Sequence, residues 1–174
     1  VNFAATAGTT SHWNTGRKII FSNNYGSNQK AFRWEELDVY QKAALDNLTA
    51  VGATGNPSPV LNYLRGDHIN EGAAGSMRTR FTVLGDIVHS NPEHVGAPDE
   101  SFTDTDYVTF KNAKAGRSPR VYIGANDGML HAFNATNGQE SWAYVPSMLI
   151  PKMKRLAGRP YAHTYFVDGS ITVR

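Results

Sequence analysis

Three residues of the types found in hydrolases lie close together in the sequence: Asp86, His89 and Ser90. Serine, histidine and aspartate side chains together form the nucleophilic triad of many hydrolases. On an extended strand successive side chains alternate between faces, which places Asp86 and Ser90 on one face and His89 on the other. The Gly-x-Ser-x-Gly sequence of a nucleophile elbow is also absent from the chain. We therefore predict that Asp86 and Ser90 satisfy buried backbone groups at a blade corner and that this segment has no catalytic role.

A second segment contains four carboxylates, at Asp99, Glu100, Asp104 and Asp106, and is a candidate calcium-binding loop. A calcium-binding EF-hand loop has Gly at its sixth position and Glu at its twelfth. Counting from Asp99 gives Asp104 and Phe110 at these positions, and counting from Asp104 fails in the same way. The spacing therefore predicts a solvated acidic loop and no metal site.

A third candidate is the triplet Arg65-Gly66-Asp67, which is the tripeptide that integrins recognise. In that role the carboxylate would complete a metal site on the receptor and the guanidinium would pair with a nearby acid. Such recognition requires the triplet to lie on an exposed, protruding loop. The alternative is structural, because Gly66 is also suited to end a helix in the left-handed conformation. We keep the triplet as a candidate adhesion site with this condition attached.

Two aspartates each precede a glycine after a predicted strand, at Asp127-Gly128 and Asp168-Gly169. An aspartate side chain in this position can accept a hydrogen bond from the backbone of the turn that follows it. We therefore predict structural turn roles for both aspartates, and Asn126 and Gly128 share that role. Among the remaining polar residues, His131 is predicted to be a hydrogen-bonded core or inter-blade histidine and not a ligand.

The amino-acid composition is typical of an ordinary globular domain and does not indicate a binding partner. The chain has 174 residues, 40% of them hydrophobic and 18% charged, and no cysteine. Its 17 basic and 15 acidic residues leave a net charge of +2, and they are scattered, so nucleic acid is not predicted as a partner. The sequence has no apolar run near 18 residues, so no transmembrane segment is predicted. Without cysteine, disulfides and thiolate metal sites are excluded.

The first 80 residues predict one strand and two short helices, which we expect to form a lead-in segment packed on the rest. Residues 18–21, Lys-Ile-Ile-Phe, form a short and mostly apolar run with two β-branched residues and indicate the strand. Apolar residues recur at three- and four-residue steps from 34 to 48, with acidic residues in the first turn, and indicate the first helix. Ser58 as N-cap, Pro59 at the first helical position and Gly66 just past the end indicate the second.

Residues 81–174 are predicted to be all-β, with short strands near 83–84, 93–96, 107–110, 121–124, 129–134, 141–145, 164–167 and 171–173. Two connections have the residues of primed hairpin turns, which require glycine or asparagine at positive φ: Asn126-Asp127-Gly128 and Asn137-Gly138. They predict an antiparallel meander of three strands between residues 121 and 145.

Within the meander, residues 125–142 have the form of a propeller-blade repeat, with hairpin glycines and a closing tryptophan, Trp142, that would fill the space between blades. The repeat resembles the quinoprotein-type blade, with Asn134 and Asn137 in place of the usual Asp and Thr. A single blade cannot bury both of its faces, so further blades are expected. Residues 81–174 are predicted to be the first blades of an incomplete propeller, completed by the rest of the polypeptide or by neighbouring copies.

The flanking segments make the resemblance more specific. The motifs are VLGDIVHSNP at 83–92, VYIGANDGMLHAF at 121–133, AYVPS at 143–147 and YFVDGS at 165–170. In this order they resemble the C-terminal propeller of the PilC/PilY type IV pilus proteins, and residues 32–34 and 63–67 are similar to that family's lead-in. The resemblance covers about residue 17 to 170.

This resemblance implies a mainly β fold that is part of a seven-bladed propeller with quinoprotein-like blades. It also implies a non-enzymatic module for type IV pilus biogenesis and for adhesion to host cells or abiotic surfaces. The implied location is extracellular, at the pilus tip or the outer-membrane surface, with minor pilins and the pilus fibre as partners. The resemblance identifies no residue of this chain as a cofactor or metal ligand, and it implies that the family's calcium loop lies after Arg174.

Two alternatives remain open. The repeat ending at Trp142 also resembles quinone-dependent propeller dehydrogenases, which hold quinone and calcium with residues from many blades. A propeller scaffold in a secretion or outer-membrane assembly complex would differ from the pilus module mainly in its partner.

Overall fold

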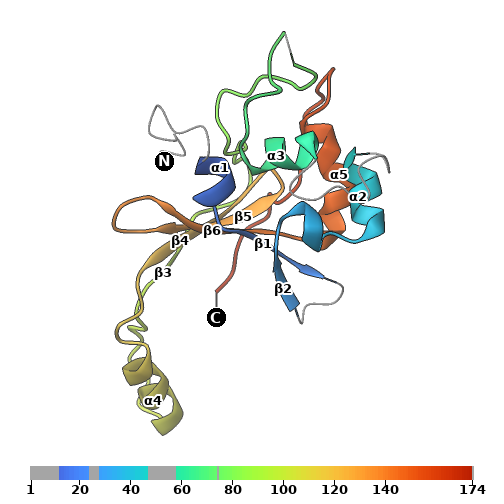
Figure 1. Ribbon diagram of the computed structural model, residues 1–174. Coiled ribbons are helices and arrows are strands. Elements are labelled where there is room, and N and C mark those ends of the chain that lie inside the picture. The colour runs from blue at the N-terminus through green and yellow to red at the C-terminus, as the bar shows by residue number, and fades with distance from the viewer. Residues whose placement is uncertain (1–11, 24–27, 47–57, 74, 174) are drawn as a thin grey trace.

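The computed structural model describes residues 12–23, 28–46, 58–73 and 75–173. Its centre is a six-stranded sheet with the order β2-β1-β6-β5-β4-β3. The strands are β1 Ile19–Asn23, β2 Asn28–Ala31, β3 Glu93–Val95, β4 Arg120–Ala125, β5 Met129–Asn134 and β6 Glu140–Val145. Figure 1 shows that helices gather beside this sheet and that one helix, α4, lies far from it.

The predicted meander is confirmed. Strands β4, β5 and β6 pair antiparallel in chain order, with Ile123 opposite His131 and His131 opposite Ala143. The two connecting turns contain Gly128 at φ 90° and Gly138 at φ 71°, as primed turns require. Strand β3 extends the meander on the side of β4.

The other half of the sheet was not predicted in this form. Strand β1 pairs in parallel with β6, with Ile19 opposite Ala143, and β2 then pairs antiparallel with β1. The predicted strand at 18–21 is therefore present, but β2 was missed because its sequence, Asn-Gln-Lys-Ala, has no apolar alternation. The sheet crosses the boundary that was predicted at residue 80.

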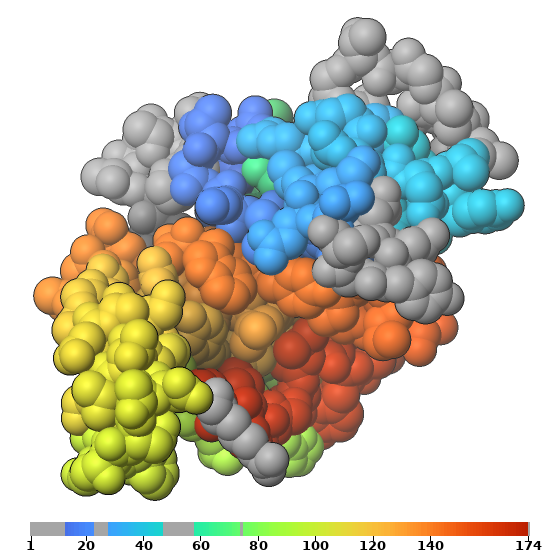
Figure 2. Space-filling view, turned by 90° about the horizontal axis from the view of Figure 1, so that it is seen from below, coloured from blue at the N-terminus to red at the C-terminus, as the bar shows by residue number. Residues whose placement is uncertain are grey.

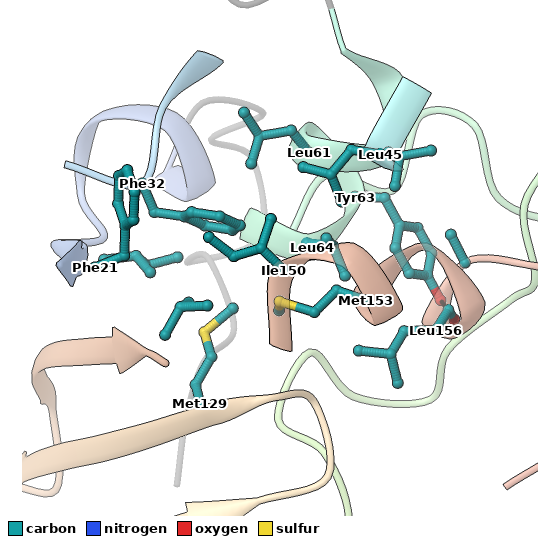
Figure 3. Close-up of a cluster of buried hydrophobic side chains, with 14 of the residues drawn as sticks. Phe21, Phe32, Leu45, Leu61, Tyr63, Leu64, Met129, Ile150, Met153 and Leu156 are labelled. Carbon is teal, nitrogen blue, oxygen red and sulfur yellow. Dashed lines mark hydrogen bonds between the residues drawn. The ribbon is translucent and has the colours of Figure 1, made fainter. Parts of the chain in front are cut away.

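The core lies between the sheet and the helices α2 Val39–Asp46, α3 Pro59–Arg65 and α5 Ile150–Met153. In Figure 3, side chains from these helices meet Phe21 and Phe32 on one side and Met129 on another. Phe21 and Phe32 pack edge to face, with ring centroids 6.0 Å apart. The 3-10 turns η3 Ser147–Leu149 and η4 Lys154–Leu156 flank α5.

The second predicted helix is confirmed in detail as α3. The Ser58 hydroxyl accepts a hydrogen bond from the Leu61 N–H at 2.9 Å, and Pro59 occupies the first helical position. Gly66 follows the helix at φ 119°, and its N–H donates to the Asn62 and Tyr63 carbonyls.

The first predicted helix is shorter than expected. Residues Trp34–Glu36 form a 3-10 turn, η1, and α2 begins only at Val39. Asp38 and Gln41 explain the break, because each side chain accepts a hydrogen bond from the other's backbone N–H, as in a capping box. Tyr40, expected on the apolar face, is 83% exposed. Leu48, at the end of the predicted helix, lies outside the described residues.

The prediction that residues 81–174 are all-β was wrong at several points. The predicted strand at 107–110 lies inside a helix, α4 Thr105–Ala113, because Asp104 caps it by accepting the Tyr107 N–H at 2.8 Å. The segments 83–84, 164–167 and 171–173 are not strands. Backbone groups near them bond to side chains instead, as where the Phe166 N–H donates to Asn126 Oδ1. A short helix, α1 His12–Thr15, was also not predicted.

Candidate functional site: the turn between β4 and β5

The turn formed by Asn126, Asp127 and Gly128 is the point where several segments meet. The Asn126 amide group is buried and donates from Nδ2 to Asp86 Oδ2 at 3.0 Å. Its Oδ1 accepts the Phe166 N–H at 3.0 Å. The Asn126 N–H also donates to the Asp86 carbonyl. One asparagine therefore joins the segment around residue 86 to the segment around residue 166.

Asp127 has two roles in the same turn. Its Oδ1 accepts the Met129 N–H at 3.1 Å, which is the predicted turn role. Its Oδ2 accepts the Gly85 N–H at 3.0 Å from the neighbouring segment. A side chain on Gly85 would not fit there, because a Cβ would lie 2.2 Å from the Asp127 nitrogen.

A buried chain of charges begins at Asp127 and runs across the sheet. His131 is fully buried, its Nε2 lies 3.1 Å from the Asp127 carboxylate, and its Nδ1 lies 2.9 Å from Glu140 Oε1. Arg17 donates to both Glu140 oxygens at 2.7 Å. Its Nη1 also donates to the Arg65 carbonyl at 2.9 Å. The prediction of a hydrogen-bonded core histidine is confirmed, and the chain connects the turn to the end of α3.

The geometry indicates that His131 is an imidazolium. Both ring nitrogens lie within hydrogen-bond distance of carboxylate oxygens, which accept hydrogen bonds, and this arrangement favours a proton on each nitrogen. Burial alone would lower the pKa of His131, but Asp127 and Glu140 outweigh it and raise that pKa to about 9. Burial would raise the pKa of Glu140, but Arg17 and His131 lower it to about 2. Within this chain of charges, the cations Arg17 and His131 therefore balance the anions Asp127 and Glu140.

Two further histidine–aspartate pairs lie at the surface beside the turn. His163 Nε2 lies 2.8 Å from Asp86 Oδ2, and His89 Nδ1 lies 2.5 Å from Asp168 Oδ2. The Tyr165 ring contacts both imidazoles, with its centroid 4.9 Å from that of His163 and 5.3 Å from that of His89. These pairs tie the segment near residue 88 to the segment near residue 166.

Asp168 does not cap the turn that follows it, contrary to the prediction. Its Oδ1 accepts the N–H groups of Val88 and His89, at 3.2 and 3.0 Å. These bonds from His89 and Val88 hold the pKa of Asp168 below its usual range. Gly169 next to it has open space around it. Asp168 therefore joins two segments that are distant in sequence and does not stabilise a local turn.

The three residues first considered for catalysis do not meet. Asp86 pairs with His163 and Asn126, and His89 pairs with Asp168. The buried Ser90 hydroxyl accepts the Gly124 N–H at 2.9 Å, which is the backbone role expected for it. The group lacks the nucleophile–base–acid order that a triad requires.

A cavity of about 210 Å³ opens beside the turn. Its walls come from α3, from residues 78–86, from the turn itself and from the segment 156–163. The sequence contains no local sign of this cavity, because its walls come from four segments that are far apart along the chain.

The candidate adhesion triplet Arg65-Gly66-Asp67 does not lie on an exposed, protruding loop, as integrin recognition would require. Arg65 is 1% exposed, and its guanidinium donates to the backbone carbonyls of Phe32, Trp13 and Asn14. Burial, together with the nearby Arg33 and Arg17, lowers the pKa of Arg65 to about 10. The Asp67 carboxylate accepts the Ile69 N–H. The triplet ends α3 and holds neighbouring backbone, and its arginine is not presented to a receptor.

The acidic segment is solvated, as predicted. Asp99, Glu100, Asp104 and Asp106 are all exposed, and Asp104 serves as the N-cap of α4. Within the part of the chain that the structure describes, no group of three or more His, Asp or Glu residues could hold a metal ion.

The remaining predicted blade residues occupy the surface of the meander. Asn137 and Gly138 are exposed at the β5–β6 turn, where Asn137 Oδ1 accepts the Gln139 N–H. Trp142 is half-buried and packs against Tyr122, with ring centroids 5.8 Å apart. Its predicted place between blades stays a prediction. Glu140 and Arg17 were missed as site residues, although Glu140 begins a strand of otherwise uncharged residues.

Comparison with known proteins agrees with this architecture. The family model described as the PilY1 beta-propeller domain matches residues 84–174. The chain is 39% identical over 152 residues to a type IV pilus biogenesis factor PilY1 homolog of Xylella fastidiosa (strain Temecula1 / ATCC 700964), covering 83% of this chain and 12% of that protein. It is 39% identical over 173 residues to type IV pilus biogenesis factor PilY1 of Pseudomonas aeruginosa (strain PAK), covering 91% of this chain and 14% of that protein.

The chain thus spans about an eighth of the length of these curated relatives. No solved structure matches it. Among the described residues, none of the helices has the length and apolar character needed to cross a membrane. The matched family model begins at Leu84, next to the Gly85 that Asp127 holds, and includes the whole meander. The chain belongs to the PilY1 β-propeller family.

Proposed function

We propose that this chain is part of a factor for type IV pilus biogenesis and serves there as a non-enzymatic scaffold. The observation that carries the proposal is the turn of Asn126, Asp127 and Gly128, which lies within the region that matches the family and holds the flanking segments together. Relatives that cover most of this chain are named as pilus biogenesis factors.

A scaffold role agrees with the chemistry of the site. The polar groups of the turn form hydrogen bonds with one another and with the backbone, so their role is to stabilise the fold. The buried histidine lies between two carboxylates and is held as a cation, which makes it unsuited to accept a proton from a substrate. We therefore propose no enzymatic activity for the chain, including that of a quinone-dependent dehydrogenase.

The finer features are proposed on the same basis. The antiparallel meander with its Asn-Asp-Gly turn supports a quinoprotein-like blade, and we propose that this blade belongs to a seven-bladed propeller. We propose an exported protein at the pilus tip or outer surface, with minor pilins, the fibre and host or abiotic surfaces as partners. Calcium, where the family uses it, is proposed to bind outside this chain.

The test uses the full-length protein in the bacterium that encodes it. An in-frame deletion is complemented with the wild-type gene, with Asn126→Ala, or with the exposed control Asn137→Ala. Surface pili are recovered by shearing, attachment is measured separately, and the amount of the protein is followed by immunoblot.

We expect the deletion to lose surface pili, the wild type and Asn137→Ala to restore them, and Asn126→Ala to restore fewer. Normal piliation in the deletion strain would overturn the role in biogenesis. Normal attachment per pilus in strains with reduced piliation would overturn the adhesion part and leave biogenesis standing.

A further inference from the structure

The cavity beside the β4–β5 turn has mainly apolar walls. Leu64 of α3, Val83 and Leu84 of the loop, and Leu156 of η4 line it, together with the rings of Tyr63 and Tyr161. An apolar cavity of about 150 Å³ takes up benzene, whereas sites for drug-sized ligands measure about 300–1,000 Å³. A cavity of about 210 Å³ therefore suits one apolar side chain, not a large ligand.

Most of the charged groups in the walls are already paired. Arg80 forms an ion pair with Glu71 at 2.7 Å and donates to the carbonyls of Tyr63 and Asp67. Asp127 is paired with His131, and Asp86 with His163. These groups have little capacity left for a charged ligand.

Arg78 differs from these groups. Its guanidinium lies 3.9 Å from the centroid of the Tyr161 ring, and its Nε donates to the Leu156 carbonyl at 2.7 Å. Within the described residues it forms no ion pair, and its two terminal nitrogens are left without a hydrogen-bond acceptor. The aromatic ring and the Nε bond fix the plane of the guanidinium. Such a fixed fork matches the two oxygens of a carboxylate.

Phe81 adds an apolar contact at the rim, because its side chain is fully exposed although it belongs to the cavity lining. A ligand that filled the cavity with one side chain could continue across this ring to solvent. This arrangement favours the end of a polypeptide over a small free acid.

We propose that this cavity binds the C-terminal residue of a peptide or protein partner, with its apolar side chain inside the cavity and its free carboxylate on Arg78. This inference goes beyond the proposed function and does not depend on it. In this arrangement Arg78 recognises the carboxylate, and the apolar walls select the side chain of the last residue.

The experiment is titration calorimetry with the full-length protein and the tripeptide acetyl-Gly-Gly-Phe. The matched probe is the same peptide with a C-terminal amide, which has the same side chain and no carboxylate. We expect the acid to bind at least tenfold more tightly than the amide. This comparison uses the unaltered protein, so it does not depend on the folding of any variant.

Variants locate the site. Arg78→Gln is expected to weaken binding of the acid at least tenfold, whereas Arg155→Gln, which removes an exposed charge outside the cavity, is expected to leave it unchanged. Leu84→Trp fills the cavity and keeps Arg78, and it is expected to abolish binding.

Four results would overturn the proposal. The first two concern the unaltered protein: equal binding of the acid and the amide, or no binding of the acid. The other two concern the variants: an equal loss of binding in Arg155→Gln and Arg78→Gln, or unchanged binding in Leu84→Trp. Acetyl-phenylalanine binding as tightly as the tripeptide would overturn the assignment to a peptide terminus, because the rim contact would then contribute nothing.

Discussion

Two polar regions of this molecule are built in opposite ways. At the β4–β5 turn, Asn126 is buried and Asp127 is partly buried, and both side chains are bonded to segments that are distant in sequence. The second region, residues 96–119, which we call the arm, holds the acidic segment and α4, and α4 has no buried residue. In Figure 2 the yellow-green segment around α4 forms a separate lobe of the surface.

The arm is stabilised by contacts within itself. Asp104 caps α4, the rings of Phe102, Tyr107 and Phe110 form a small exposed cluster, and Arg117 lies over Phe110. The turn, by contrast, stabilises other parts of the molecule. A polar side chain therefore has a large effect where its loss leaves a buried partner unsatisfied, and a small one where water can replace it.

The largest effect is expected from Glu140→Gln. This change removes the carboxylate that pairs with Arg17 and leaves two buried cations with one anion. Losing one partner of a buried ion pair costs about 3–5 kcal/mol. Hydrogen-exchange mass spectrometry of the full-length protein should show faster exchange across β5 and β6. The matched change Glu100→Gln in the arm should leave these peptides unchanged, and equal exchange in both variants would contradict the comparison.

The charge chain also predicts a pH dependence. The raised pKa of His131 gives stability that is fully present below its ordinary value of 6.5 and is lost as the pH rises through about 9. The lowered pKa of Glu140 gives stability that is present above 4.5 and is lost as the pH falls through about 2. The histidine contribution is on the order of 3 kcal/mol, because one pKa unit corresponds to about 1.4 kcal/mol.

Both contributions are fully present only between about pH 4.5 and pH 6.5. Calorimetric unfolding of the full-length protein should therefore show the greatest stability of this domain in that pH range. His131→Gln, which cannot titrate, is the control and should lose the decline on the alkaline side. An identical alkaline decline in that variant would show that another group is responsible.

Asn126→Ala is expected to have the next largest effect. It leaves the Phe166 N–H without its acceptor, at a cost of about 1–3 kcal/mol, and releases the segments near residues 86 and 166. Limited proteolysis with peptide mapping should find new cleavage in both segments. Asn137→Ala, in the exposed β5–β6 turn, should keep the wild-type pattern, and the idea fails if Asn126→Ala keeps it too.

Gly128→Ala should cost about 1–2 kcal/mol, because φ is +90° and the new methyl group would lie 2.9 Å from Met153 Cε. Gly116→Ala in the arm meets no atom within 4 Å and should be close to neutral. Calorimetric unfolding temperatures compare the two. Equal shifts would mean that the backbone at the turn is less restricted than its geometry indicates.

The smallest effect is expected in the arm. Phe110→Ala removes one ring from the exposed cluster and should cost about 0.5–1 kcal/mol, confined to α4. Hydrogen exchange should increase in peptides covering residues 105–113 and stay unchanged in β4, β5 and β6. Faster exchange in the sheet would show that the arm is coupled to it.

Features that depend on neighbours in sequence were predictable. Ser58, Pro59 and Gly66 define α3 because capping acts within one turn of helix, and Gly128 and Gly138 define the hairpins for the same reason. The motifs around these turns were also sufficient to indicate the family. Asp104 carried an equally local signal for α4, but the aromatic residues of 107–110 pointed to a strand.

Features that depend on distant partners could not be predicted. Nothing in the sequence near Arg17 or Glu140 indicates that they meet, and the charge chain followed only from the tertiary structure. The same holds for Asp168, whose local sequence predicts a turn but whose carboxylate binds the backbone near residue 88. The cavity is the extreme case, because no single segment contains it.

The parallel pairing of β1 with β6 has a consequence for the order of folding. Arg17 and Glu140, which lie at this junction, are 123 residues apart in the chain. Contacts of such high sequence separation close large loops and form slowly. During synthesis β1 leaves the ribosome long before β6. The edge of β1 that pairs with β6 therefore stays unpaired until β6 has been synthesised. We therefore expect the β1–β6 junction to be among the last parts of the sheet to form, with the Arg17–Glu140 ion pair fixing its register.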